Sequence, residues 1–144
     1  MSSGVQLTIR KLAGASIALL ISFSLILFPV GNIAYAARSL MTGDYVQDTI
    51  SVAHSLQETI DIPTESEERT SAEKEAVALI TDYISRYRNR PQYNGSLSFT
   101  TMQTALNAMA GHYKTFANRP LPEDLKERLT KELAKGEKLA SRDS

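Results

Sequence analysis

Residues 98–122 carry the pattern that most constrains the fold, because their apolar side chains recur at alternating steps of three and four residues. That spacing aligns them along one side of a helix of about five turns. The members of this stripe are Phe99, Met102, Leu106, Met109, Tyr113 and Phe116. The residues between them are polar or small and almost uncharged, with Lys114 as the one charge. Such a helix is expected to lie between other surfaces rather than in bulk water.

Residues 1–36 are typical of a secretory signal rather than of a folded domain. The basic pair Arg10 and Lys11 precedes a long uncharged run that Pro29 interrupts. Small residues at alternate positions then predict cleavage after Ala36. The alternative is an uncleaved membrane anchor, since the run is long enough for the roughly 20 apolar residues that span a bilayer.

Residues 37–144 would form the mature chain, and their composition limits what it can do. They contain all 16 acidic residues and all but two of the 16 basic residues, so their net charge is close to neutral and gives no sign of a nucleic-acid-binding surface. The chain has no cysteine, which excludes a disulfide framework, thiolate metal ligands and cysteine catalysis. One small domain held together by packing is therefore expected.

Three further amphipathic segments accompany the central helix. The first begins after a cap at Asp44 or Thr42 and ends before Pro63. The second begins with a capping box at Thr70 and runs to about Asn89, and the last begins at Pro122. Their core-facing residues are expected to be Val46, Ile50, Ala53, Leu56 and Ile60, then Ala76, Leu79, Ile80, Tyr83, Ile84 and Tyr87, and finally Leu121, Leu125, Leu129 and Leu133.

The central helix is expected to begin after a cap at Ser96 or Ser98 and to end near Asn118. Gly136 is expected to weaken the last helix. Four amphipathic helices with short connectors and no alternating strand pattern predict an all-α fold, an antiparallel up-down-up-down four-helix bundle.

No pattern in the chain points to catalysis or to a cofactor. Neither His54 nor His112 has a carboxylate three or four residues upstream, as the metal sites of helical bundles require. No serine lies in a nucleophile elbow, and no glycine-rich phosphate loop is present. An alternative to a binding or assembly role is a manganese-buffering or delivery protein. The spacing of its acidic residues, however, is unlike that of loops that bind cations through oxygen ligands. Its ligands would be Glu65, Glu67, Glu68, Glu73 and Glu75.

Four segments resemble the Psb-twenty-seven family of photosystem II assembly factors. They are TGDYVQDT at 42–49, DYISRYR at 82–88, SFTTMQTALNAMAGHY at 98–113 and NRPLPEDLKERL at 118–129. The resemblance covers nearly all of the mature chain, in order and with matching connectors.

The resemblance implies a non-enzymatic four-helix protein of the thylakoid lumen, without a cofactor and monomeric when free. Such proteins bind transiently to immature or damaged photosystem II, at the large lumenal loop of an inner-antenna chlorophyll protein, and assist assembly of the manganese cluster. Many cyanobacterial members are lipoproteins with a cysteine after the signal. This chain has no cysteine, which implies a lumenal form without a lipid anchor, in a cyanobacterium or a plastid.

Two sets of residues are candidates for contact with such a partner. The first is a set of arginines, a residue type that is enriched at protein interfaces: Arg86, Arg88, Arg90 and Arg119. The alternative for the first three is that they complement the dipole at the end of their own helix. The second set is the polar side of the central helix, represented by Thr101 and Thr104.

Overall fold

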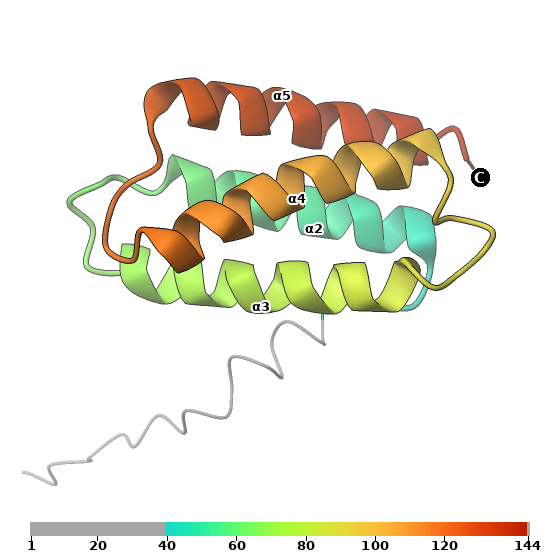
Figure 1. The fold of residues 1–144 in the computed structure, drawn as a ribbon, viewed down its shortest axis with the longest axis horizontal. Coiled ribbons are helices and arrows are strands. Elements are labelled where there is room, and N and C mark those ends of the chain that lie inside the picture. The colour runs from blue at the N-terminus through green and yellow to red at the C-terminus, as the bar shows by residue number, and fades with distance from the viewer. Residues whose placement is uncertain (1–39, 144) are drawn as a thin grey trace, which may run out of the picture.

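The computed structural model describes residues 40–143, which form four helices and no strand. The helices are α2 (Tyr45–Asp61), α3 (Arg69–Tyr87), α4 (Leu97–Thr115) and α5 (Glu123–Ala140). Consecutive helices run in opposite directions and pack against each other, and α2 also packs against α5 to close the ring (Figure 1). The predicted antiparallel four-helix bundle is therefore confirmed. The signal predicted for residues 1–36 lies outside the described residues.

The bundle has two ends, which are named here for use below. The tyrosine end is where α2 and α4 begin and where α3 and α5 end, on the right in Figure 1. The groove end is where α2 and α4 end and where α3 and α5 begin. None of the helices in residues 40–143 is long and apolar enough to cross a membrane.

Side-chain caps fix the starts of α2 and α4. The Asp44 carboxylate accepts a hydrogen bond from the Gln47 amide at 2.8 Å, and the Ser96 hydroxyl accepts one from the Phe99 amide at 3.1 Å. These bonds satisfy amides that have no partner inside the helix. Of the two serines predicted as the cap of α4, Ser96 is the one that caps, while Ser98 is fully buried.

The capping box predicted at Thr70 is wrong. The backbone is already turning before this residue, because the Arg69 amide donates to the Ser66 carbonyl at 3.2 Å. Helix α3 therefore begins at Arg69, two residues earlier than a cap at Thr70 implies, and Thr70 lies inside it. Glu73 does not reach back to the cap; its carboxylate instead accepts a hydrogen bond from Arg69 at 2.8 Å.

The stripe predicted for α4 is confirmed at five of its six positions, since all of its members except Phe116 are buried. Phe116 is 44% exposed because α4 ends at Thr115, earlier than predicted. Asn118 follows in the left-handed conformation, with φ of 71°, which ends the helical path.

The buried side of α2 differs from the predicted one. Val46 and Ile50 are half-buried, whereas the fully buried side includes Tyr45, Asp48 and Thr49. Two of these residues are polar, and burying them requires hydrogen-bond partners from other helices.

Candidate partner-binding surfaces

Asp48 is fully buried and organises the tyrosine end of the bundle. Its carboxylate accepts hydrogen bonds from the amides of Thr42 at 2.6 Å and Gly43 at 3.1 Å, and from the Tyr87 hydroxyl at 2.6 Å. Gly43 has a φ of 98°, a conformation that favours glycine and turns the chain back onto Asp48. The buried carboxylate therefore joins the segment before α2 to the end of α3.

Four other buried hydroxyl groups form hydrogen bonds at this end. The Tyr45 and Ser98 hydroxyls lie 2.6 Å apart, and the Thr49 and Tyr83 hydroxyls lie 2.8 Å apart. The Ser98 hydroxyl also donates to the carboxylate of Asp143, after α5. At this end, hydrogen bonds thus join α2 to α3 and to α4, and α4 to the segment after α5.

The aromatic rings at this end pack against one another. The Tyr45 ring stacks on Tyr93 with 4.1 Å between centroids and meets Tyr87 edge-on at 5.1 Å. Burial raises the pKa of both Tyr83 and Tyr87 far above the usual range, and the hydrogen bond to Asp48 adds to the shift at Tyr87. These phenols therefore stay neutral near pH 7 and act as hydrogen-bond donors within the core.

Two of the candidate arginines support this network from outside. The Arg86 guanidinium lies 3.8 Å from the Asp48 carboxylate, and the Arg90 guanidinium lies over the Tyr87 ring, 5.0 Å from its centroid. Arg88 is exposed and has no ion-pair partner among residues 40–143. The structure therefore gives Arg86 and Arg90 internal contacts and leaves Arg88 available to a partner.

The structure does not bring the four candidate arginines together. The first three lie at the C-terminal end of α3, a helix of 19 residues and so about 28 Å long. Arg119 lies at the opposite, groove end, next to Asn118, whose carbonyl accepts a hydrogen bond from Arg69 at 3.4 Å. Its guanidinium covers the Phe116 ring, 5.8 Å from the centroid. The predicted antiparallel topology already implies this separation, because Arg119 follows the next helix, which runs in the opposite direction. Grouping the four arginines by residue type did not take that topology into account.

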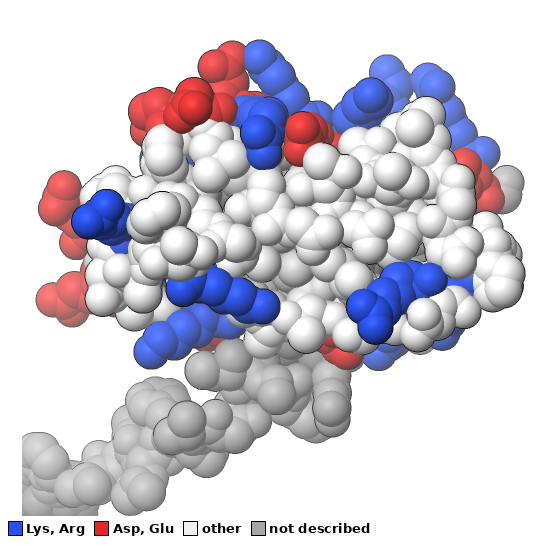
Figure 2. Space-filling view, viewed as in Figure 1, with Lys and Arg blue, Asp and Glu red and all other residues white. Residues whose placement is uncertain are grey.

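The outer side of α4 is uncharged over most of its length, as predicted. Figure 2 shows that the face over α4 is largely free of charged side chains, which gather along its borders. Thr104 is exposed on this side and Thr101 is half-buried. The large apolar side chains Leu97, 62% exposed, and Phe116 lie at the two ends of the same helix. This surface is named the α4 face: the exposed uncharged residues from Leu97 to Phe116.

The residues considered for metal binding are not arranged as a metal site. In the part of the chain that the structure describes, no three side chains from His, Asp or Glu come together as a possible cluster. His54 Nε2 lies 3.2 Å from Glu137 Oε1, and His112 Nε2 lies 3.3 Å from the Arg119 carbonyl oxygen. Glu73, one of the manganese ligands considered, is engaged by Arg69.

Comparison with known proteins agrees with the geometry. Residues 7–139 match the model of the family described as Photosystem II Pbs27. The chain is 43% identical over 113 residues to Photosystem II lipoprotein Psb27 of Synechocystis sp., covering 78% of this chain and 84% of the relative. It is 38% identical over 127 residues to Photosystem II assembly factor lipoprotein Psb27 of Thermosynechococcus vestitus, covering 88% and 92% of the two chains.

The fold comparison leads to the same family. The solution structure of Psb27 from cyanobacterial photosystem II superposes with a TM-score of 0.68 and 45% identity, covering 72% of this chain and 90% of that one. The sequence segments that resembled this family are also the ones that build the bundle described above, from the Asp48 network to the α4 face. The chain therefore belongs to the photosystem II Pbs27 family.

Proposed function

We propose that this chain is a non-enzymatic factor for the assembly and repair of photosystem II. The observation that carries the proposal is the family match over residues 7–139. A relative that shares 38% of its residues over 127 positions is named a photosystem II assembly factor. The chain would bind transiently to the lumenal side of immature photosystem II, at the large lumenal loop of an inner-antenna chlorophyll protein, and so assist assembly of the manganese cluster.

The α4 face supports this role as the docking surface. It combines a lack of charge with exposed apolar side chains at both ends, Leu97 and Phe116. The lack of charge is the feature that resembles an interface, because the centre of a protein interface is depleted of charged residues. Arg86 and Arg90 are less suitable as docking residues, because both already contact groups of the tyrosine end. Arg88, at the rim of that end, and Arg119, beside Phe116, could add charged contacts around the docked partner.

Co-purification with monomeric, manganese-depleted photosystem II tests the function. We expect the chain to be retained on that intermediate and to be absent from mature oxygen-evolving dimers. Recovery with mature dimers alone, or with no photosystem, would contradict the proposal.

Charged substitutions on the surface test the docking site. Thr104→Glu introduces a charge at an exposed position of the α4 face, and Thr130→Glu is the matched control at an exposed position of α5. We expect Thr104→Glu to weaken retention at least tenfold and Thr130→Glu to leave it unchanged, with equal helix content by circular dichroism. If Arg88→Glu abolishes retention and Thr104→Glu does not, docking takes place at the arginines instead.

The second part of the proposal is that the predicted signal, residues 1–36, is removed. Removal of residues 1–36 would release residues 37–144 into the lumen, without the lipid that the names of the two relatives indicate for them. The chain contains no cysteine that could carry such a lipid. The mass of the native protein tests this, because retention of the signal would increase it by the mass of those residues.

A further inference from the structure

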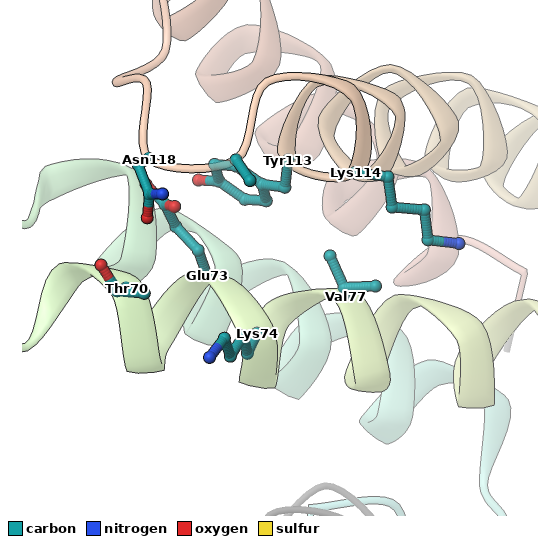
Figure 3. A pocket seen from close by; sticks show the side chains of 8 residues that line it. Thr70, Glu73, Lys74, Val77, Tyr113, Lys114 and Asn118 are labelled. Carbon is teal, nitrogen blue, oxygen red and sulfur yellow. The ribbon is translucent and has the colours of Figure 1, made fainter.

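A groove lies at the groove end, between the first half of α3 and the last turn of α4 (Figure 3). Its volume is about 250 Å³, which is enough for one large apolar side chain and the backbone next to it. It is lined by Thr70, Glu73, Lys74, Val77, Tyr113, Lys114, Ala117 and Asn118. None of these residues takes part in the network of the tyrosine end or belongs to the candidate docking residues.

The middle of the groove is apolar. Figure 3 shows Val77 pointing from α3 into the space below α4, and the Tyr113 ring lying above α3 near Glu73. Ala117 adds an exposed methyl group after the end of α4. An apolar side chain placed here would exchange water for contacts with these three residues, which is the main source of affinity in such sites.

The Tyr113 hydroxyl is an unused hydrogen-bond donor at one end of this apolar region. Only 7% of Tyr113 is exposed, yet its hydroxyl has no hydrogen-bond partner among residues 40–143. Burial raises the pKa of this phenol, and the nearby Glu73 carboxylate adds to the shift, so the hydroxyl keeps its proton. Among the described residues, the fully buried side-chain oxygens without a partner belong to Asp82 and Glu132, so the Tyr113 oxygen faces solvent from the groove. An acceptor brought by a ligand would replace water at this hydroxyl without competing with another group of the protein.

The rim of the groove is positively charged. Lys74 and Lys114 are exposed and have no ion-pair partners among the described residues. The one carboxylate that lines the groove, Glu73, is held by Arg69 at 2.8 Å, so its charge is largely compensated. Two free ammonium groups beside an apolar groove complement a ligand that is apolar in one part and anionic in the next.

We propose that this groove binds an extended peptide segment of a partner protein, in which an apolar side chain stands next to a carboxylate. The apolar side chain lies between Val77 and Ala117, and a peptide carbonyl accepts a hydrogen bond from the Tyr113 hydroxyl. The carboxylate lies at the rim, attracted by the Lys74 and Lys114 ammonium groups, whose side chains extend from opposite sides of the groove (Figure 3). The groove is open to solvent on one side, so the side chain enters while the peptide backbone stays at the surface. This site is separate from the α4 face and does not depend on the photosystem as partner.

A titration of the ¹⁵N-labelled full chain with the peptide acetyl-Gly-Leu-Asp-Gly-amide tests the proposal by nuclear magnetic resonance. We expect saturable shifts at the backbone amides of Val77, Lys114 and Asn118, with a dissociation constant of about 1 mM. Replacing Leu by Ala in the peptide should weaken binding roughly tenfold, because several buried carbons are lost. Replacing Asp by Asn should weaken it about threefold, because the attraction to the two lysines is lost.

Variants of the protein separate this site from the rest of the molecule. Tyr113→Phe should weaken peptide binding about fivefold, the loss of one hydrogen bond, and leave the melting temperature unchanged. The control Tyr83→Phe removes a hydroxyl that bonds to Thr49 at the other end, so it should lower the melting temperature and leave peptide binding unchanged. The charge reversal of both Lys74 and Lys114 to Glu should weaken binding at least as much as Tyr113→Phe.

Three results would overturn the proposal. The first is the absence of saturable shifts at peptide concentrations up to about 10 mM. The second is binding that neither Tyr113→Phe nor the lysine reversals weaken. The third is a set of shifts on the α4 face instead of the groove. Retention on photosystem II is measured separately, so failure of the peptide site and failure of the proposed function can be told apart.

Discussion

The two ends of the bundle use tyrosine in opposite ways. At the tyrosine end, the hydroxyls of Tyr45, Tyr83 and Tyr87 all have hydrogen-bond partners inside the protein. At the groove end, Tyr113 is nearly as buried but its hydroxyl has no such partner among residues 40–143. The first three therefore contribute to the stability of the fold, whereas the fourth offers a donor to something outside it.

The two ends also differ in how the segments before and after the helices are held in place. At the tyrosine end, Asp48 holds the backbone before α2, and Ser98 holds Asp143 after α5. At the groove end, a single side chain joins the two connectors: Arg69 donates to the carbonyls of Thr64 at 3.0 Å and Asn118 at 3.4 Å. One end is thus fixed by a buried network, and the other by one arginine whose side chain is 16% exposed, beside an open groove.

Removal of the buried carboxylate at each end is the strongest test of this difference. Asp48→Ala leaves the Tyr87 hydroxyl and the amides of Thr42 and Gly43 without their acceptor, so we expect the free energy of unfolding to fall by about 3 kcal/mol. Glu73→Ala, the matched change at the groove end, removes one largely buried hydrogen-bonded ion pair, while Arg69 keeps its hydrogen bonds to two carbonyls, so we expect a smaller loss of about 1.5 kcal/mol. Urea unfolding followed by circular dichroism measures both values. Equal losses would show that the two ends do not differ.

A smaller effect is expected from single hydroxyls. Tyr87→Phe removes a hydrogen bond to a buried carboxylate, so we expect a loss of about 1.5 kcal/mol in the free energy of unfolding. Tyr113→Phe removes no bond within the bundle and should change it by less than about 0.5 kcal/mol. A large loss for Tyr113→Phe would mean that its hydroxyl has a structural partner, and that the groove lacks a free donor.

The periodicity of the sequence was sufficient to predict the helices and most of the core. The spacing of three and four residues encodes which side of α4 is buried, and the prediction fails only where the helix ends, at Phe116. In α2 the prediction missed Asp48 and Thr49, because their partners Tyr87 and Tyr83 are 39 and 34 residues away. Hydrophobic spacing cannot identify polar residues that are buried through contacts with another helix.

The candidate surfaces were less predictable than the helices. The lack of charge on the α4 face was predicted from one helix alone, and its role in docking stays a prediction. The arginines were grouped by residue type, and the fold then separated Arg119 from the others by the length of α3. The groove is formed by two segments about 40 residues apart without a motif, so only their packing shows it.

Substitution of two helical glycines compares the ends through small changes in the free energy of unfolding, and these changes are expected to have opposite signs. Gly136 was expected to weaken α5, but it is buried, and a Cβ added there would lie 2.5 Å from the Met102 sulfur. Gly136→Ala must displace a fully buried side chain, a cost that exceeds the gain in helix propensity, so we expect a net loss of about 1 kcal/mol. Gly111, in the part of α4 nearer the groove end, is exposed with nothing within 4 Å of an added Cβ.

Gly111→Ala should therefore raise the free energy of unfolding by roughly 0.5–1 kcal/mol, because alanine favours the helix and meets no neighbour. Thermal unfolding of both variants measures the pair, with a lower melting temperature for Gly136→Ala and a higher one for Gly111→Ala. A gain for both would mean that Met102 can move aside and that the contact between α4 and α5 is loosely packed. A lower melting temperature for both would mean that a side chain at position 111 is unfavourable for a reason other than a clash with a neighbour. Opposite signs would show that close packing ends before the part of α4 that leads to the groove.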